Sequence, residues 1–597
     1  MIFAAQIGHD HAAWRDAVSR HARRLGLPVR EGDLALADGR AIRFAWLGPA
    51  PAASPDPRVP PANGALVLAT SGDATPAPDV RNAEALARLL ADPAKPAATR
   101  VGVLPAAGEV IAAVPPAAVE QLYFARVGGG WVVSNDLRLM AGVVGGELDE
   151  AGVLGLFRYG LTPAPLTLFR GVGRVPVGHL LRMGPGAEIA LVRFAVLGDA
   201  SHREPGAADP AALIRETLDA ILRRAPQSPV VYFSGGVDSS LIAARLAALG
   251  RDDAILVNYA FGPDDPKARL ARRIAQHLGL RLHQVAWNPA DIPAVLERLG
   301  RDYPFPFCDT ALIPGNLLAH AAMPLARSSR TTMHGVGAGA LFGQRLHIRR
   351  LWRPLGWIPA PVRRALAWPY GALRLWRQDS DAVRLCEVLQ RSAHVPLIHA
   401  MMAEHPMEGI AYAMPPETGR TLDAAIRDYV EPLAAGRDYD LLTSVLHQMY
   451  FTSREFSAVV LGPQMAAGVD SIAPFMEPLM MQRGFALTWD EKRPGGVPKG
   501  LLRNLLAAHL PADLAWAAGG SFLAPRSEIY AHPAMRALVE DTALAADNPL
   551  LDYCRADTVR AMLMRLVRGE SLAASARKFA WAFIFASAWL RQTRSEI

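Results

Sequence analysis

The sequence is poor in cysteine. Only three of its 597 residues are cysteines, at 308, 386 and 554, and they show neither a CxxC pair nor the Cys/His spacing of a metal site. This scarcity excludes a disulfide framework and a zinc-binding module, and it favours a reducing compartment. We therefore expect a cytoplasmic protein.

The sequence also lacks an export signal and a long apolar run. Its first residues contain no basic region followed by an apolar stretch and a cleavage site. The longest suspicious run, Phe579 to Leu590, is shorter than the about 20 residues that a bilayer requires. We expect no membrane span.

Lysine is scarce, although the chain is basic. Only five of the 63 basic residues are lysines, while the formal net charge is +7. Abundant Ala and Pro accompany the arginines, so we attribute much of the charge to codon bias and expect no nucleic-acid partner. A content of 51% hydrophobic and 20% charged residues indicates a large globular protein of two or three domains.

The pattern of the chain changes near residue 200. Before it, short apolar segments alternate with Gly, Pro and Asn/Asp, as in antiparallel sheets, and a Pro-rich loop lies at 49–61. The polar segment 198–212 leads into Ala/Leu/Arg-rich helices with occasional buried strands. We therefore predict two domains, residues 1–200 and residues 201–597.

The segment 229–250 carries the clearest chemical signal. A short apolar run, 229–233, leads into SGGVDSS at 234–240, and a helix follows at once. Strand, glycine turn and helix N-terminus create a nest of backbone N–H groups that favours a phosphate chain. The alternative is an ordinary turn with a helix N-cap, but such a turn does not require both a strand before it and a helix after it. The absence of Gly-Lys-Ser/Thr excludes a Walker loop.

The residues of this heptapeptide have separate expected roles. The two glycines permit close approach and positive φ, and the serines add hydroxyl donors. Asp238 is the expected ligand of the Mg²⁺ that accompanies pyrophosphate. The expected phosphate-binding residues are Ser234, Gly235, Gly236, Asp238, Ser239 and Ser240.

The heptapeptide resembles the pyrophosphate-binding loop of the N-type ATP pyrophosphatases, specifically of the asparagine synthetase superfamily. Segments 253–287 and 306–319 resemble the same superfamily, and the end of the first domain is similar to an amidotransferase-like domain. The resemblance implies an α+β, Ntn-hydrolase-like sandwich followed by an α/β synthetase domain with a parallel sheet, of the adenine nucleotide α-hydrolase type. It also implies ATP and Mg²⁺ as cofactors.

Three positions depart from the family pattern. Ile2 stands where glutamine-hydrolysing members carry a nucleophilic cysteine, so we expect the first domain to serve as a scaffold or to dock a peptide. Residues 335–343 resemble the second nucleotide motif, which implies ATP contacts at Gly335 and Gly337, but Gly339 replaces its Asp. Gly519 replaces a lysine. The loss of the Asp at 339 and the loss of the lysine at 519 are each expected to lower the rate by about 10²- to 10³-fold.

The resemblance also implies two catalytic residues. Segment 465–477 is similar to the one that carries a catalytic Glu, and Asp470 takes that position as the expected acid/base group. Lys499 and Arg503, four residues apart, can present cations on one helix face, with a solvated helix start as an equally open alternative. Asp309 or Glu477 can replace the lost carboxylate oxygen, and this choice stays open.

Chain length, the missing cysteine, an Arg-rich insertion and the AWLRQ tail make the chain most similar to lasso peptide cyclases. This implies an ATP-dependent, AMP-forming amide ligase that adenylates an Asp or Glu side chain of a precursor peptide, whose N-terminal amine then closes a macrolactam. The implied partners are the precursor peptide, a leader-binding protein and a leader protease. Two alternatives remain: a pseudo-synthetase that binds nucleotide or peptide, and an ammonia-dependent asparagine synthetase-like ligase.

The insertion at 345–377 is basic and rich in tryptophan. It contains eight arginines and four tryptophans without Asp or Glu. Packing of the tryptophans into the core ranks first as its interpretation. Contact with an anionic membrane surface or an acidic peptide ranks second.

Overall fold

The computed structural model describes most of the chain in three regions. The described residues are 2–8, 12–48, 65–69, 74–77, 79–91, 99–116, 118, 120–184, 188–195, 209–307, 312–343, 358–359, 361–362, 365–366, 411–434, 464, 469–517, 526–572 and 574–594. The Pro-rich loop, Asp309, Gly519 and nearly all of 345–377 lie outside them. The border predicted near residue 200 also lies outside them, and it stays a prediction.

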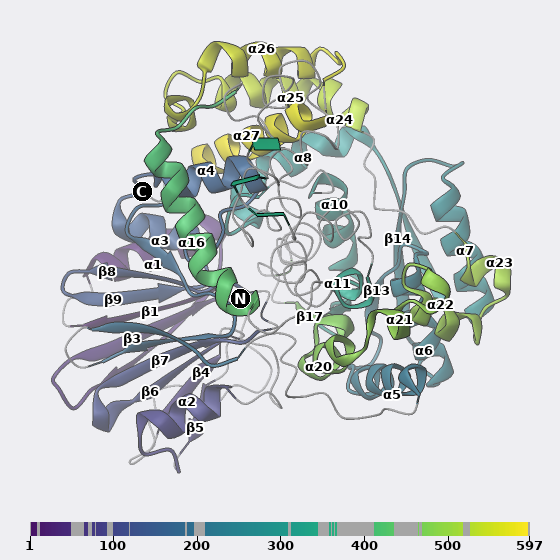
Figure 1. The fold of residues 1–597 in the computed structure, drawn as a ribbon, viewed down its shortest axis with the longest axis horizontal. Coiled ribbons are helices and arrows are strands. Elements are labelled where there is room, and N and C mark those ends of the chain that lie inside the picture. Colours follow the sequence, from purple (N-terminus) through teal and green to yellow (C-terminus); the bar gives the residue numbers. More distant parts are fainter. Residues whose placement is uncertain are drawn as a thin grey trace.

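The first region consists of two antiparallel six-stranded sheets that lie face to face (Figure 1). The first sheet has the order β10-β8-β9-β1-β3-β2, and the second β12-β11-β7-β6-β4-β5. The strands are β1 (Ile2–Gly8), β2 (Val29–Ala35), β3 (Ala41–Leu47), β4 (Ala65–Ala69), β5 (Ala74–Ala77), β6 (Arg100–Leu104), β7 (Glu109–Val114), β8 (Tyr123–Val127), β9 (Gly130–Ser134), β10 (Val172–Arg174), β11 (His179–Met183) and β12 (Ile189–Arg193).

Alternation along the strands creates this sandwich. In β1, Phe3 and Ala5 face the second sheet, while Ile2 and Ala4 face the helices. The helices are α1 (Ala12–Leu25), α3 (Leu137–Val144) and α4 (Glu150–Tyr159) by the first sheet, with α2 (Ala83–Ala91) on the outer face of the second. The predicted antiparallel sandwich is confirmed.

The second region is a parallel five-stranded sheet of order β15-β14-β13-β16-β17. Its strands are β13 (Val230–Tyr232), β14 (Ile255–Ala260), β15 (Arg281–Ala286), β16 (Thr331–Met333) and β17 (Asp470–Ile472). Val230 and Tyr232 face α10 (Leu312–Ala322), while Val231 faces a second layer of helices. This layer contains α5 (Pro210–Arg223), α6 (Val237–Ala248), α7 (Pro266–Leu278), α11 (Ala338–Phe342), α20 (Pro478–Ala486) and α22 (Gly500–Ala507). The predicted parallel α/β domain is confirmed.

A helical cluster joins these two regions (Figure 1). It contains α8 (Ile292–Glu297), α9 (Leu299–Asp302), α16 (Pro416–Ala434), α24 (Arg526–Ala531), α25 (Pro533–Leu538), α26 (Ala556–Val567) and α27 (Ala574–Thr593). The short helices α21 (Trp489–Lys492) and α23 (Ala512–Ala515) lie beside the parallel sheet.

The helix α27 includes the apolar run noted in the sequence. It packs within the helical cluster and also contacts the first region, since the ring centroids of Phe579 and Phe157 of α4 lie 5.3 Å apart. The indole Nε1 of Trp589 donates to the Tyr303 carbonyl at 2.8 Å. No helix among the described segments is both long and apolar enough to cross a membrane.

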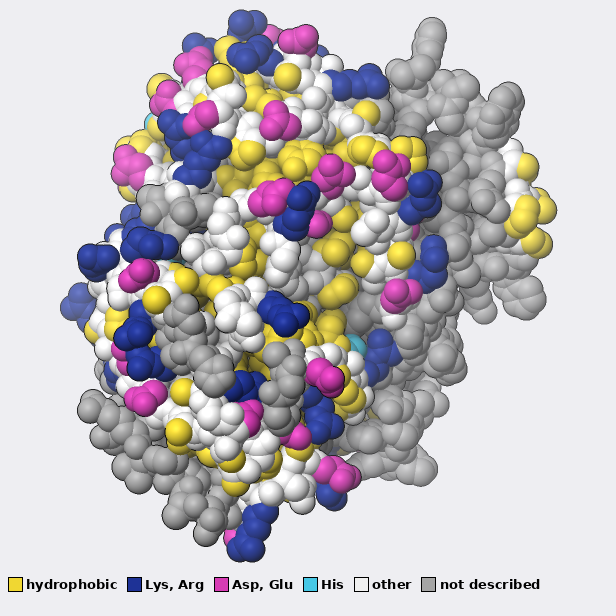
Figure 2. Space-filling view, turned by 90° about the vertical axis from the view of Figure 1, so that its left-hand side faces the viewer, with side chains coloured by type: hydrophobic (Ala, Val, Ile, Leu, Met, Phe, Trp, Pro, Cys, Tyr) yellow, Lys and Arg dark blue, Asp and Glu magenta, His cyan; other side chains and the backbone are white. Residues whose placement is uncertain are grey.

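Charged side chains are mixed on the outside of the first region and the helical cluster. On the face shown in Figure 2, Lys and Arg side chains lie among Asp and Glu side chains. A nucleic-acid surface is marked by basic side chains gathered on one face. The described part of this face has no such arrangement.

Candidate functional site

The strand order locates the candidate site. The chain adds β14 and β15 on one side of β13, then returns to the other side for β16 and β17. In open α/β sheets, ligands bind outside the carboxyl ends of the strands where the order reverses. Here this point lies between β13 and β16, whose carboxyl ends lead into the SGGVDSS loop (234–240) and into the turn 334–337.

The SGGVDSS loop is held in shape by its own serines. Ser239 Oγ accepts from the Ser234 backbone N–H at 3.2 Å and lies 3.3 Å from the Gly236 carbonyl, to which it donates. Ser234 Oγ accepts from the Gly236 N–H at 3.2 Å. These two hydroxyls therefore shape the loop in addition to any role as phosphate ligands.

The two glycines of the loop, Gly235 and Gly236, differ in conformation and in surroundings. Gly235 has a φ of 72°, and a Cβ there would lie 3.1 Å from the Ala271 backbone nitrogen of α7. Gly236 is the N-cap of α6 in extended conformation, and no side chain caps this helix. Since the amides of a first helical turn have no partners within the helix, this end is suited to bind an anion.

Asp238, in the first turn of α6, is the central ionisable group. Its Oδ2 forms an ion pair with Lys499 Nζ. Its Oδ1 is buried and has no hydrogen-bond partner among the described residues, and the same holds for Ser240 Oγ two residues later. Buried polar atoms are rarely left unsatisfied in native proteins, so an absent ligand is the natural partner of these two atoms.

Lys499 is held in place by a strained turn. It has a φ of 56°, a left-handed conformation that is uncommon outside glycine, and only 9% of it is exposed. The turn before it is fixed by Arg493, which donates to the Gly496 carbonyl at 2.7 Å and lies 4.8 Å from the Trp489 ring centroid. The backbone conformation of this turn therefore positions the ammonium group against Asp238.

The turn after β16 packs directly on the loop. A Cβ on Gly335 would lie 2.7 Å from Asp238 Cβ, and one on Gly337, whose φ is 97°, would lie 2.7 Å from Met476 Cγ. The two predicted glycines thus lie at the candidate site. Gly339 lies within α11 and brings no carboxylate there.

His334 was missed by the sequence reasoning. Its Nδ1 accepts from the Val336 N–H at 3.4 Å, so Nε2 carries the proton toward Ser471 Oγ at 2.9 Å. Burial lowers its pKa to about 3, so the ring is neutral at physiological pH. The available signal was its position directly after β16, one of the two strands between which the strand order reverses.

Asp470 is not brought to the loop. It begins β17 and pairs with Thr331, the first residue of β16, whereas the loop follows the carboxyl end of β13. In a parallel sheet, this register places Asp470 at the opposite edge from the loop. Its assignment as the acid/base group stays a prediction.

The other predicted cations and carboxylates have local partners. Arg503 NH1 donates to the Ala515 and Ala517 carbonyls at 3.4 and 3.3 Å, and Glu477 pairs with Arg224 at 3.2 Å. Among the residues that the structure describes, no three His, Cys, Asp or Glu side chains form a group that could hold a metal. Asp238 is therefore the predicted metal ligand that lies at the loop.

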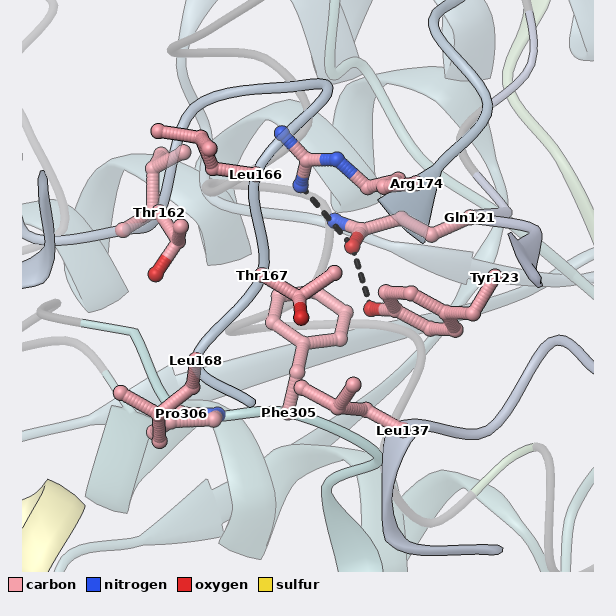
Figure 3. A pocket seen from close by; sticks show the side chains of 11 residues that line it. Gln121, Tyr123, Leu137, Thr162, Leu166, Thr167, Leu168, Arg174, Phe305 and Pro306 are labelled. Carbon is pink, nitrogen blue, oxygen red and sulfur yellow. Dashed lines mark hydrogen bonds between the residues drawn. The ribbon is translucent and has the colours of Figure 1, made fainter. Parts of the chain in front are cut away.

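A separate pocket lies between the first region and the segment before α10 (Figure 3). Its polar side is a chain in which Tyr123 Oη and Arg174 NH1 both donate to Gln121 Oε1, the latter at 3.0 Å. Phe305 and Pro306 close the other side. Its volume of about 20 Å³ suits a water molecule, so it is too small for a substrate.

Fold and loop together define the class: an α/β domain with a glycine- and serine-rich loop at the carboxyl edge of a parallel sheet. A family model described as asparagine synthase matches residues 212–591, and the chain belongs to this family. Members of the family are ATP-dependent amide ligases. No curated protein sequence matches the chain.

Two solved structures are similar to part of the chain. One is the allosteric regulatory enzyme of purine biosynthesis, at 12% identity over 48% of this chain and 80% of that chain, with a TM-score of 0.21. The other is glutamine phosphoribosylpyrophosphate amidotransferase from B. subtilis complexed with ADP and GMP, at 12% identity over 48% and 65%, with a TM-score of 0.20. Scores this low carry no argument about this protein.

Proposed function

We propose that the chain binds ATP at the SGGVDSS loop and uses it to convert a carboxylate into an acyl-adenylate, which an amine then captures as an amide. The observation that carries this proposal is Asp238, whose Oδ1 is buried without a partner at the uncapped start of α6 while Oδ2 contacts Lys499. Membership of the asparagine synthase family supports the same chemistry.

The proposed reaction has two steps. A carboxylate oxygen attacks the α-phosphorus of ATP, and the bond to the β-phosphate oxygen breaks to release pyrophosphate. The amine nitrogen then attacks the acyl carbon, AMP leaves, and the nitrogen loses a proton. In this scheme the amides of the loop bind the phosphate chain, and the Lys499 ammonium stabilises the charge that develops on pyrophosphate.

Magnesium fits the site as a companion of the nucleotide. Asp238 Oδ1 would hold it together with phosphate oxygens, because Mg²⁺ is commonly bound by one or two carboxylates plus substrate phosphates. The ion supplies positive charge to the phosphate chain when bound. Asp470 remains the proposed acid/base group for the amine, as the resemblance implies.

The proposed acyl donor is an Asp or Glu side chain of a precursor peptide, with the N-terminal amine of the same peptide as the nucleophile. This lasso-type macrolactam closure is supported by the absence of cysteine from the first 200 residues, which leaves no thiol to release ammonia from glutamine there. The first region then serves as a scaffold or docks the peptide, and a leader-binding protein and a leader protease are the expected partners.

A pseudo-synthetase is the second candidate. It is favoured by Gly339, which leaves α11 without a carboxylate, and by the lack of a group of metal-binding side chains among the described residues. In this case the loop binds nucleotide without turnover.

The test is pyrophosphate release by the purified full-length chain with ATP, Mg²⁺ and one of three acceptor sets. Release with a peptide that carries a free N-terminus and an internal Asp or Glu supports the cyclase, and an N-acetylated copy of this peptide is the control that must give no macrolactam. Release with aspartate and ammonium supports the small-molecule ligase. ATP binding without release supports the pseudo-synthetase, and no ATP binding refutes the proposal.

A further inference from the structure

The helices α6 and α22 pack against each other and are joined at both ends (Figure 1). At their starts, Asp238 in the first turn of α6 pairs with Lys499, the N-cap of α22. At their ends, Arg245 in the last turn of α6 donates through NH1 to His509 Nε2 at 2.8 Å, two residues after α22 ends. Leucines of both helices lie in one buried cluster between these contacts. Polar contacts thus fix the relative position of the two helices at either end.

Arg245 is itself held by a carboxylate on a third helix. Its Nε and NH2 donate to the two oxygens of Asp219 of α5 at 2.8 and 2.7 Å, which is a bidentate arrangement. Only 11% of the Arg245 side chain and 9% of the Asp219 side chain are exposed. Because the guanidinium is planar, these two bonds also fix the direction of NH1, which meets His509.

The contact between Arg245 and His509 requires a neutral imidazole. A guanidinium only donates, so Nε2 of His509 must offer its lone pair, and the proton of the ring lies on Nδ1. Burial and the charge of Arg245 lower the pKa of His509, while the Asp219 carboxylate raises it. These are the charged groups that face the ring within the described segments, since Asp513 of α23 pairs with Arg273 of α7. His509 is partly exposed, so protons from solvent reach it.

Protonation of His509 breaks this contact. A charged imidazole carries a hydrogen on both nitrogens, so Nε2 and the Arg245 NH1 would both be donors with like charge. Arg245 cannot turn away without losing its two bonds to Asp219. His509 is therefore the group that moves away, and the end of α22 is then no longer held to α6.

We infer that Arg245 and His509 are positioning residues, which hold α22 against α6 and thereby keep Lys499 in place at the loop, and that acid releases their contact. The inference rests on the proposed function, because its consequence is a change in ATP-dependent pyrophosphate release. At neutral pH the ring is neutral and the contact is intact. As the pH falls and the ring takes up a proton, the contact is lost and pyrophosphate release decreases.

The test compares pyrophosphate release by the full-length parent and by His509→Gln between about pH 7.5 and pH 5.5, a range that spans the ordinary histidine pKa. Gln can accept from Arg245 through its amide oxygen but does not titrate. We expect the parent to lose at least about tenfold more of its rate than the variant, the effect of one charge-assisted contact. His277→Gln, which removes an exposed histidine of α7, is the matched control and should follow the parent. Parallel profiles of the parent and His509→Gln overturn the inference.

Amide hydrogen exchange of α22 separates a failure of the inference from a failure of the proposed function. After correction for the intrinsic pH dependence of exchange, protection of α22 should fall in acid in the parent but not in His509→Gln, with or without turnover. His509→Lys, which stays charged, should show at neutral pH the low protection and the reduced pyrophosphate release that the parent shows in acid. Equal protection in all three proteins overturns the inference. A parent that releases no pyrophosphate at any pH refutes the proposed function, and the positioning role falls with it.

Discussion

Two aspartates of this molecule, the buried Asp136 and the partly exposed Asp238, are each paired with a cation but differ in how completely they are bonded. Asp136, at the start of α3, accepts from Arg138 through both oxygens and from His21 Nε2 through Oδ2, and its side chain is fully buried. Asp238 is paired through Oδ2, and its Oδ1 has no hydrogen-bond partner within the described segments.

The cations of the two pairs differ in the same way. Arg138 also donates to the Gly300 and Arg301 carbonyls at 2.7 and 2.6 Å, so it ties the first region to the helical cluster. In the part of the chain that the structure describes, Lys499 contacts no second acceptor of this kind. Saturated bonding at Asp136 indicates a structural role, and incomplete bonding at Asp238 indicates a place for a ligand.

The largest expected effect is on stability, at the saturated pair. Arg138→Met leaves the Asp136 carboxylate and two carbonyls buried without this donor, so we expect a loss of about 3–5 kcal/mol in the free energy of unfolding. The urea midpoint measures it. Arg170→Met, which breaks an exposed ion pair with Glu147, is the control and should cost less than about 1 kcal/mol. Equal midpoints for the two variants would contradict the structural role of Asp136.

The second prediction concerns the incompletely bonded pair. Asp238→Asn should reduce pyrophosphate release by about 10²- to 10³-fold, because it removes a charged ligand from the phosphate site. Its urea midpoint should move less than that of Arg138→Met, since Asp238 lies at a site that solvent partly reaches. Asp513→Asn, which breaks an exposed pair with Arg273, is the control for both measurements. Full pyrophosphate release by Asp238→Asn would contradict a role of Asp238 in binding a ligand.

The elements that surround Asp238 could be predicted from the sequence because their signals are local. The apolar run before SGGVDSS becomes β13 and the segment after it α6, and the segment 253–287, which resembles the superfamily, contains β14, α7 and β15. Glycine positions, apolar alternation and helical periodicity all operate over a few residues.

The partners of Asp238 could not be predicted with the same precision. Lys499 lies 261 residues from Asp238 in the chain, and its contact with Asp238 depends on a left-handed turn that no sequence pattern predicts. Likewise, the resemblance assigned a role to Asp470, but only the register of β16 and β17 shows that it begins its strand at the other edge. His334 was overlooked because a single histidine after a strand has no distinctive pattern.

The smallest expected effect is a difference between the two regions in how their contribution to stability depends on pH. The Arg138 guanidinium and His21 hold the pKa of Asp136 far below its usual range despite the burial that opposes them, so this pair keeps its contribution to stability until the pH falls below about 4. Burial instead lowers the pKa of His334 to about 3, below the about 6.5 of an unfolded histidine. Between these values the unfolded chain binds a proton that the folded chain excludes, so stability falls as the pH decreases.

The slope for His334 approaches about 1.4 kcal/mol per pH unit, and the loss between pH 6.5 and pH 5 is about 1.6 kcal/mol. Urea midpoints of the parent and of His334→Gln at pH 7, 6 and 5 measure it, since subtraction removes the histidines that both proteins share. We expect the variant to be the less acid-sensitive of the two, because Gln can still donate to Ser471 but does not titrate. Parallel pH profiles would mean that His334 takes up its proton in the folded state, and the end of β16 would then be more open to water than its burial indicates.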